Sequence, residues 1–333
     1  MRLMNTCIAL TVFFSVLLLS TVFGTILIDD TFFISCNTEE QTITIPQGSG
    51  VSNIGSILEN KGILKKDLFF ELYVMLTNND KNLKAGIFKI QPNTSLENIV
   101  STITSAPALE ESTVKVTIPE GFTLEQIAER LEENNICSKS DFLDLAKQKP
   151  TLDYWFLKDA TTYEGFLFPD TYDFYYYSTA NQVIKKLVGE FDDKLISLGI
   201  TAETGNIYDI VKTASLIEKE AYHKEDMPKI SSVINNRQKE DMLLQIDASL
   251  LYSIGHKEKI YEKDLQIDDP YNLYKYKGLP PTPICNPGLD ALSATLTPEK
   301  TNYLYYVADG KTKYHHFSKT YEEHQKNINL YMN

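Results

Sequence analysis

Residues 214–222 read Ala-Ser-Leu-Ile-Glu-Lys-Glu-Ala-Tyr and place two glutamates in an otherwise apolar pattern. On a 3.6-residue period, the apolar residues between 207 and 221 form one stripe, which predicts a helix packed on a core. Glu218 lies inside this stripe and Glu220 lies at its flank. Because desolvation raises the pKa of a carboxyl group, an acid placed there can keep its proton near neutral pH and donate it to a leaving group. An exposed Glu-Lys-Glu at a helix end is the alternative interpretation.

The composition of the 333-residue chain indicates a globular protein of two or three domains, with 43% hydrophobic and 23% charged residues. The 45 acidic residues outnumber the 32 basic ones, for a net charge of −13. This balance argues against a surface that neutralises phosphates, so we do not expect nucleic acid as a partner. The four cysteines form no Cys-x-x-Cys pair and the five histidines are dispersed apart from His315-His316, so neither a metal site nor a disulfide framework is expected.

The amino-terminal segment 6–28 has no charged side chain and is long enough, as a helix, to cross the ~30 Å hydrocarbon layer of a membrane. Arg2 precedes it and Asp29-Asp30 follows it, which predicts a cytoplasmic tail at 1–5 and the rest of the chain on the outer side of the cell membrane. A cleaved signal peptide is the alternative, although the apolar run exceeds the usual ~7–15 residues and no Ala-x-Ala-like site follows. Lipidation at Cys36 is a further alternative, because residues 33–36 loosely match a lipoprotein cleavage box.

An internal repeat predicts the domain plan. Residues 43–48 (Ile-Thr-Ile-Pro-Gln-Gly) and 116–121 (Val-Thr-Ile-Pro-Glu-Gly) correspond, with Ile45 and Ile118 73 positions apart. Each copy predicts a strand, a Pro-x-Gly turn and two helices. The first copy continues into a strand-like run at 82–90 and a helix at 95–104, an order that resembles glycan-binding LysM modules, although such units also serve as scaffolds. We therefore expect a LysM-like module at 40–110, a second repeat-like unit at 114–150 and a further domain at 151–333.

Several motifs in residues 151–333 have the composition of a cleft. The aromatic run 172–177 suits stacking on sugar rings, or ordinary core packing. A loop at 277–288 with four prolines and two glycines is stiff enough for a substrate wall or a connector. Gln245 and Asp247 either share one face of a short strand, or Asp247 caps a helix at 248–252. Asp226 is expected to cap a helix with Pro228 in its first turn.

The last motifs predict a strand and turn at 303–310, a partner strand at 314–318 and a terminal helix at 321–331. The whole set, in its order and approximate spacing, closely resembles the MltG/YceG family of endolytic murein transglycosylases. The residues that carry the resemblance are Glu164-Gly165, Phe168-Pro169-Asp170-Thr171-Tyr172, residues 214–220, Asn236-Arg237, Leu244-Gln245-x-Asp247, Tyr271-Asn272, Gly278-Leu279-Pro280-Pro281, Asn286-Pro287-Gly288, residues 303–310 and Glu323-His324.

The resemblance implies an α+β protein with a single amino-terminal membrane helix, LysM-like modules and a mixed α/β catalytic domain. It implies a cell-wall lyase that cuts the MurNAc-GlcNAc β-1,4 bond of nascent peptidoglycan strands, leaves 1,6-anhydro-MurNAc ends and terminates strand elongation. Neither a metal nor an organic cofactor is implied. The expected partners are peptidoglycan strands, the membrane and, from the family's role, cell-wall synthases.

The resemblance also assigns residues. The helix ending at Glu220 is similar to that of lytic transglycosylases and goose-type lysozymes, in which this glutamate is the catalytic acid. The apolar stripe favours Glu218, which we retain as a supporting residue. The implied substrate-binding residues are Asn236, Arg237, Gln245, Asp247, Tyr271, Asn272 and Asn286, with Glu164 and Tyr172 on the opposite wall. Thr282, Asp269 and Leu273 depart from the family's usual Gly, Ser and Thr, which affects the expected subsites rather than the reaction.

Two other functions are compatible with these residues. One is a membrane-anchored glycan-binding scaffold without catalysis. The other is a hydrolytic muramidase with two carboxylates, in which Glu218, Glu164 or Asp247 is the partner of Glu220. A peptidase is disfavoured, because no Ser-His-Asp or Cys-His order occurs around these motifs.

Overall fold

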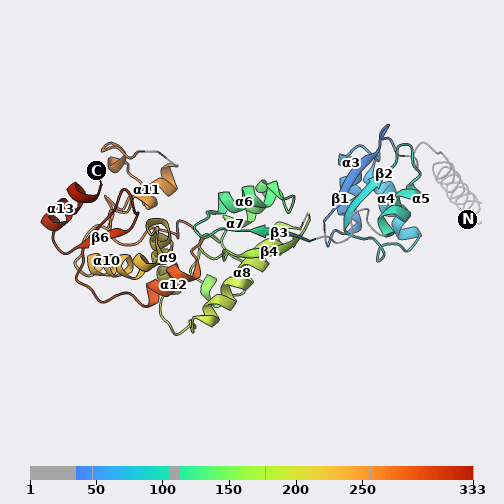
Figure 1. The fold of residues 1–333 in the computed structure, drawn as a ribbon. Coiled ribbons are helices and arrows are strands. Elements are labelled where there is room, and N and C mark those ends of the chain that lie inside the picture. Colours follow the sequence, from blue (N-terminus) through green and yellow to red (C-terminus); the bar gives the residue numbers. More distant parts are fainter. Residues whose placement is uncertain are drawn as a thin grey trace, which may run out of the picture. The chain divides into compact units, whose positions relative to one another are not determined.

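The computed structural model describes residues 35–46, 48–105, 113–176, 178–255, 257 and 259–332 (Figure 1). The predicted membrane segment 6–28 lies outside these ranges. Among the helices that the structure describes, none combines the length and the apolar character needed to span a bilayer. Contacts divide the chain into two compact units, residues 1–113 with 175–178 and residues 114–174 with 179–333.

The described residues of the first unit form a two-stranded antiparallel sheet and three helices. Strand β1 (Gln41–Ile45) pairs with β2 (Gly86–Ile90), with Ile43 opposite Phe88. The helices are α3 (Val51–Asn60), α4 (Asp67–Leu76) and α5 (Leu96–Thr104). Ile43, Phe88 and one face of each helix form a separate hydrophobic core. The predicted order of helices and strands in the first repeat is confirmed, whereas glycan binding by this unit stays a prediction.

The second unit begins with the second copy of the repeat. Strand β3 (Thr113–Thr117) lies beside β4 (Thr171–Tyr175) in a two-stranded sheet. Helices α6 (Leu124–Glu133) and α7 (Lys139–Ala146) follow β3 and pack on each other. Thr123 begins α6 with a capping box that includes Gln126. The predicted strand, turn and two helices are therefore confirmed in this copy as well.

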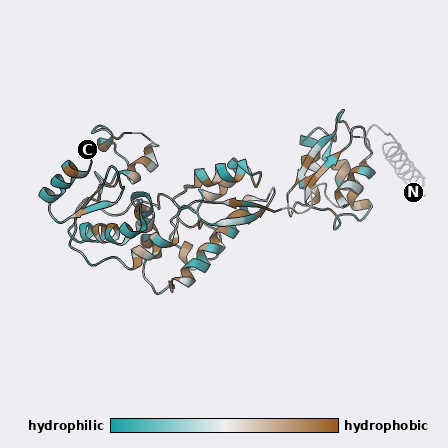
Figure 2. Cartoon of the chain, viewed as in Figure 1, coloured by the Kyte–Doolittle hydropathy of each residue, from teal (hydrophilic) through white to brown (hydrophobic). Residues whose placement is uncertain are grey.

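An aromatic cluster forms part of the core of the second unit. Phe166 lies 5.4 Å from Phe191 of α8 (Ala180–Ser197) and 6.1 Å from Phe156 of a short helix, η1 (Trp155–Leu157), between ring centroids. In the aromatic run, Tyr172 and Phe174 are buried and Tyr175 is exposed, as expected for alternate positions of a strand. The buried members of that run are therefore core residues. Figure 2 shows hydrophobic and hydrophilic segments alternating along the helices of each unit, as expected for amphipathic helices.

Helix α9 (Ile207–Glu220) packs against three further helices of the second unit, α10 (Met227–Lys239), α11 (Asp247–Ile254) and α12 (Leu289–Leu296). Two short helices, η2 (Lys224–Asp226) and η3 (Asp264–Gln266), lie in the connections. Asp226 precedes α10 as predicted, with Pro228 in the first turn, but its side chain makes no capping hydrogen bond. Its carboxylate instead accepts a hydrogen bond from the backbone N–H of His315, at 2.7 Å.

The carboxyl-terminal part of the second unit is a hairpin followed by a helix. Strands β5 (Tyr305–Ala308) and β6 (His315–Ser318) pair antiparallel, with Val307 opposite His316. Helix α13 (Tyr321–Tyr331) follows, and Thr320 begins it with a capping box. These elements confirm the predicted hairpin and terminal helix.

Candidate active site

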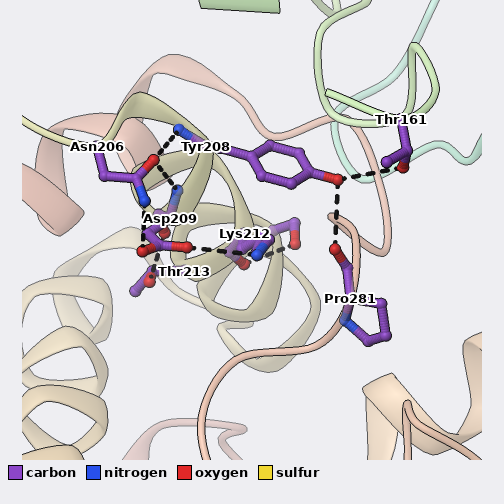
Figure 3. A network of polar contacts seen from close by, with 8 residues as sticks. Thr161, Asn206, Tyr208, Asp209, Lys212, Thr213 and Pro281 are labelled. Atoms are coloured by element: carbon purple, nitrogen blue, oxygen red, sulfur yellow. Dashed lines mark hydrogen bonds and ion pairs between the residues drawn. The ribbon is translucent and has the colours of Figure 1, made fainter. Parts of the chain in front are cut away.

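The amino-terminal end of α9 is fixed by a network of polar contacts (Figure 3). The side-chain oxygen of Asn206 accepts hydrogen bonds from the backbone N–H groups of Tyr208 (3.1 Å) and Asp209 (3.4 Å). These two groups would otherwise lack partners at the helix start. The hydroxyl of Tyr208 contacts that of Thr161 at 3.5 Å and donates to the carbonyl oxygen of Pro281 at 3.3 Å. The network ties the start of the glutamate-bearing helix to the proline-rich loop.

The middle of α9 holds the same loop closely. The hydroxyl of Ser215 accepts a hydrogen bond from the backbone N–H of Ile284 at 3.1 Å. Gly165 lies where a β-carbon would come within 2.6 Å of Pro283 and 2.7 Å of Val211, and its φ is +91°. Only glycine fits this position, because it has both the conformational freedom and the small size. These contacts hold the loop firmly, in agreement with the stiffness that its composition predicts.

Glu220 is the last residue of α9 and is half-buried. Its Oε2 accepts a hydrogen bond from the hydroxyl of Tyr306 on β5, at 2.9 Å. Burial raises the pKa of Glu220 to about 7, while the Tyr306 hydrogen bond lowers this pKa and the negative charge of Asp247 raises it. Both protonation states of Glu220 are therefore accessible near neutral pH, which an acid that later acts as a base requires.

The residues behind Tyr306 hold its ring in place. The His315 ring meets the Tyr306 ring edge-on, with centroids 5.4 Å apart. Nδ1 of His315 lies 3.1 Å from the Asp226 carboxylate, and both of these side chains are almost fully buried. Because the imidazole is fixed by a buried carboxylate, the tyrosine that packs on it has little freedom to leave Glu220.

Glu220 lies in a cleft of about 1100 Å³. Helix α11 contributes Asp247 and Tyr252, and the loops that follow contribute Tyr271 and Thr282, whose hydroxyls lie 2.7 Å apart. The remaining lining residues are Thr123, Leu124, Glu125, Gln126, Glu129, Lys147, Thr162, Lys219, Ala248, Leu251, Ser253, Gly255 and Ile284. Of the residues predicted from sequence, the cleft brings Glu220, Asp247 and Tyr271 together.

The sequence does not predict that α6 and the residue before it form one wall of this cleft, here called the α6 wall. Residues 123–126 and Glu129 lie in the segment 114–150, which the sequence indicated only as a unit linking to the catalytic domain. A repeat pattern predicts the helices but not the neighbours that they face. No signal in the segment itself identifies it as part of the cleft.

Glu218 is half-buried and is not among the residues that line the cleft. Its Oε2 accepts a hydrogen bond from the backbone N–H of Gly288 at 3.0 Å. Burial raises the pKa of Glu218 to about 6, the Gly288 hydrogen bond lowers it, and Glu120 nearby raises it. This carboxylate therefore holds the loop that precedes α12.

Glu164 is fully buried at the junction of three parts of the site. Its Oε2 accepts hydrogen bonds from the backbone N–H of Leu124 at the start of α6 (3.2 Å) and from the Tyr252 hydroxyl (3.0 Å), and its Oε1 accepts one from the Asn286 amide (2.9 Å). Burial raises the pKa of Glu164 to about 8, although these hydrogen bonds lower it. Glu164 thus joins α6, α11 and the loop at Asn286.

The predicted substrate-binding asparagines contact neighbouring backbone groups. The Asn286 oxygen accepts from the N–H groups of Gly165 (3.0 Å) and Leu167 (2.9 Å), and its amide also donates to the Phe122 carbonyl (3.0 Å). Asn272 and Asn236 likewise donate to two backbone carbonyls each, Leu265 and Ile267 for Asn272, and Thr301 and Tyr303 for Asn236.

Arg237 and Tyr172 also have partners within the protein. Arg237 donates to the carbonyls of Leu304 (2.6 Å) and Leu244 (2.8 Å) and to the Gln245 side chain (3.3 Å). The Tyr172 hydroxyl donates to the carbonyl of Phe168 at 2.6 Å. These contacts hold loops in place, and direct contact of these residues with a sugar stays a prediction.

Neither local interpretation of Gln245 and Asp247 is right. Gln245 has a φ of +52° and is not in a strand, so the two side chains do not share a strand face. Asp247 is the first residue of α11 and does not cap it, because the helix begins one residue earlier than predicted. The Asp247 carboxylate accepts a hydrogen bond from the Tyr274 hydroxyl.

Among the residues that the structure describes, no three His, Cys, Asp or Glu side chains are placed to share a metal ion. The functional groups that line the cleft include the carboxylates of Glu220 and Asp247 and the hydroxyl groups of Tyr271 and Thr282.

The fold and the site define a class of α+β proteins in which the last residue of a core helix is a glutamate that lines a cleft. The chain belongs to the YceG-like family, whose model matches residues 43–330. It is 34% identical to the endolytic murein transglycosylase of Bacillus subtilis over 85% of this chain and 82% of that protein. It is 31% identical to the Streptococcus pneumoniae D39 protein of the same name, over 88% of this chain and 58% of the longer pneumococcal protein.

A solved structure has the same fold. The crystal structure of a YceG-like protein from Listeria monocytogenes is 36% identical in sequence, with a TM-score of 0.58. The match covers 87% of this chain and 99% of the Listeria chain.

Proposed function

We propose that this protein is an endolytic peptidoglycan lytic transglycosylase in which Glu220 is both acid and base. The observation that carries the proposal is the half-buried Glu220 in the cleft, with its pKa raised to about 7. The Bacillus and pneumococcal relatives are named endolytic murein transglycosylases, which supports the same substrate here.

The reaction needs one carboxyl group that changes its protonation state. Protonated Glu220 donates to the glycosidic oxygen as the bond between C1 of MurNAc and O4 of GlcNAc breaks. The resulting carboxylate then takes the proton from the C6 hydroxyl of the same MurNAc, whose oxygen bonds to C1. The products are a GlcNAc hydroxyl and a 1,6-anhydro-MurNAc end, and Glu220 has regained its proton.

Asp247 and Tyr306 adjust this acid from two sides. The negative charge of Asp247 favours protonated Glu220 before the reaction and stabilises positive charge developing at C1. The Tyr306 hydroxyl stabilises the carboxylate that forms when the proton leaves. Tyr252 and Tyr271 offer aromatic faces to the sugar rings. In this proposal Asn236, Arg237, Asn272, Asn286 and Glu164 act on the substrate through the loops and helices that they hold.

The finer biology is part of the proposal. Residues 6–28 anchor the chain in the cell membrane, the catalytic domain lies on the outer side, and cleavage of nascent strands ends their elongation. Cell-wall synthases are the expected partners. Protease treatment of cells from which the cell wall and any outer membrane have been removed tests the orientation. A domain on the outer side of the cell membrane is then digested without lysis, whereas a cytoplasmic domain is digested only after the membrane is permeabilised.

Mass spectrometry of products from nascent, uncross-linked peptidoglycan tests the reaction. Wild-type residues 30–333 should release anhydro-MurNAc ends, Glu220→Gln should release none, and the matched Glu218→Gln should retain cleavage. Reducing ends would instead identify a hydrolytic muramidase. Absence of cleavage by a folded wild type would favour the glycan-binding scaffold.

A further inference from the structure

One wall of the cleft carries charged side chains, and an uncharged glycan strand has no groups of opposite charge to pair with them. Glu125 and Glu129 on α6 and Lys147 after α7 all line it. On the α11 side, by contrast, the lining residues beyond Asp247 are uncharged, among them Leu251, Tyr252 and Tyr271. The two walls therefore suit different parts of a substrate.

The charges of the α6 wall form ion pairs that are open to solvent. Nζ of Lys147 lies 2.7 Å from the Glu125 carboxylate, and these side chains are 53% and 45% exposed. Glu129 pairs with Lys139 at 2.5 Å and is 56% exposed. Ion pairs exposed to this degree contribute little to stability, so they exchange for charges on a ligand at little cost.

The α6 wall is held rigidly relative to Glu220. The start of α6 has its capping box at Thr123 and donates the Leu124 N–H to the buried Glu164. The preceding loop exchanges backbone hydrogen bonds with Asn286, through Gly121 (2.9 Å) and Phe122 (2.8 Å). Next to it, Lys219 of α9 donates to the carbonyl of Gly121 at 3.3 Å. The backbone at the start of α6, from which Glu125 projects, is therefore fixed relative to α9 and Glu220.

The sugars of murein are uncharged, but the lactyl group of each MurNAc carries a short peptide. That peptide has carboxylates and, when it is not cross-linked, a free side-chain amine. A wall with carboxylates and an ammonium in alternation is complementary to such a zwitterionic chain. A glycan without peptides offers no charge to this wall.

We propose that this wall, with Glu125 and Glu129 of α6 and Lys147 after α7, is a subsite for the short peptide of MurNAc when that peptide is not cross-linked. Lys147 binds a peptide carboxylate, and Glu125 with Glu129 binds the free side-chain ammonium. The inference rests on the proposed function and extends it, because cross-linking consumes this amine and so weakens binding. The enzyme would thereby select strands that have not yet been cross-linked.

Cleavage of matched substrates by the full-length protein, purified in detergent, tests the subsite. We expect Lys147→Gln to lower kcat/KM on uncross-linked, peptide-bearing strands about 5- to 30-fold, as for loss of one charge-assisted contact. Strands whose peptides an amidase has removed should be cut within about twofold of the wild-type rate. The matched control is Lys115→Gln, since Lys115 pairs with Asp173 at 3.1 Å in the same unit and does not line the cleft.

A separate measurement tests the role of Glu125 and Glu129. Acetylation of the side-chain amine should slow wild-type cleavage of peptide-bearing strands, and Glu125→Gln with Glu129→Gln should remove that difference. Equal losses on peptide-bearing and peptide-free strands would assign the wall a structural role, and no loss on either would show that it does not meet the peptide. Both results overturn the inference.

Failure of the proposed function is measured separately. If the wild type cuts neither kind of strand, the transglycosylase proposal fails, and binding then tests the subsite. The Glu220→Gln protein is titrated calorimetrically with GlcNAc-MurNAc-pentapeptide bearing a free amine. Weaker binding after Lys147→Gln supports the subsite, and identical binding overturns it.

Discussion

The Tyr306 hydroxyl donates a hydrogen bond to Oε2 of Glu220 at 2.9 Å, across 86 positions of sequence. This bond stabilises the carboxylate and so lowers the pKa of Glu220, whereas burial raises it to about 7. The free enzyme must carry protonated Glu220 in order to cleave. Its kcat/KM is therefore expected to fall as pH rises through about 7.

Tyr306→Phe removes the donor and keeps the ring. Because the carboxylate loses a hydrogen bond and the acid does not, the pKa of Glu220 should rise, and the basic limb of the kcat/KM profile should move to higher pH. We also expect roughly a tenfold lower kcat at pH 6, from the less well stabilised carboxylate. Measured pH–rate profiles check this, with Tyr305→Phe as a neighbouring control on the same strand. A limb that stays in place, or moves to lower pH, would show that the bond does not control the acid.

Asp247→Asn should have the opposite effect on the same profile. The aspartate charge raises the pKa of Glu220, so its removal lowers that pKa and moves the basic limb to lower pH. The amide oxygen can still accept from Tyr274, which limits structural damage. At pH 6, kcat should fall about 10- to 100-fold if Asp247 also stabilises charge at C1. Asp268→Asn is the control, because Asp268 contacts Lys275 and Tyr276 and does not line the cleft. An unchanged kcat would remove Asp247 from the mechanism.

The sequence predicts the local elements well because short-range patterns fix them. Apolar periodicity and caps predict both copies of the repeat, the glutamate helix, the hairpin and α13. The choice between Glu218 and Glu220 is different. The apolar stripe favours Glu218 because this residue lies within the stripe, but the helix ends at Glu220, and this end lines the cleft. Where a helix ends relative to a cleft depends on tertiary packing.

The roles of the polar residues were harder to predict. The backbone carbonyls of a buried loop need hydrogen-bond donors, and so does a bound ligand. A sequence motif does not show which of these two a polar side chain binds. Asn286, Asn236 and Arg237 satisfy backbone groups of segments far from them in sequence. The contribution of α6 to the cleft is likewise a long-range property. It depends on Glu164, 40 residues from Leu124.

Glu164 should make stability depend on pH. Its pKa is raised from 4.5 to about 8 in the folded protein, so the folded state holds a proton that the unfolded state releases. The resulting stability is complete below about pH 4.5 and is lost as pH rises towards about 8. Glu164→Gln cannot titrate, so its free energy of unfolding should fall less than that of the wild type between pH 5 and 9. At pH 5 it should be less stable by about 1–3 kcal/mol, because its amide faces the donor of Asn286. Denaturant unfolding at several pH values measures both effects, and parallel curves for the two proteins would contradict the assignment.

Gly165 lies close to both Val211 of the glutamate helix and Pro283 of the proline-rich loop, and this packing predicts a large effect of a single methyl group. In Gly165→Ala the added carbon would lie 2.6 Å from Pro283 and 2.7 Å from Val211, at a φ of +91°. Backbone strain and overpacking together should cost about 2–4 kcal/mol. Gly199→Ala is the matched control, because its φ is +69° but no atom lies within 4 Å of the added carbon. It should lose only about 1 kcal/mol, from backbone strain alone. Denaturant unfolding compares the two variants. Equal losses would mean that the loop yields to the methyl group, and the proline-rich wall would then not be the rigid boundary of the cleft that its contacts with α9 indicate.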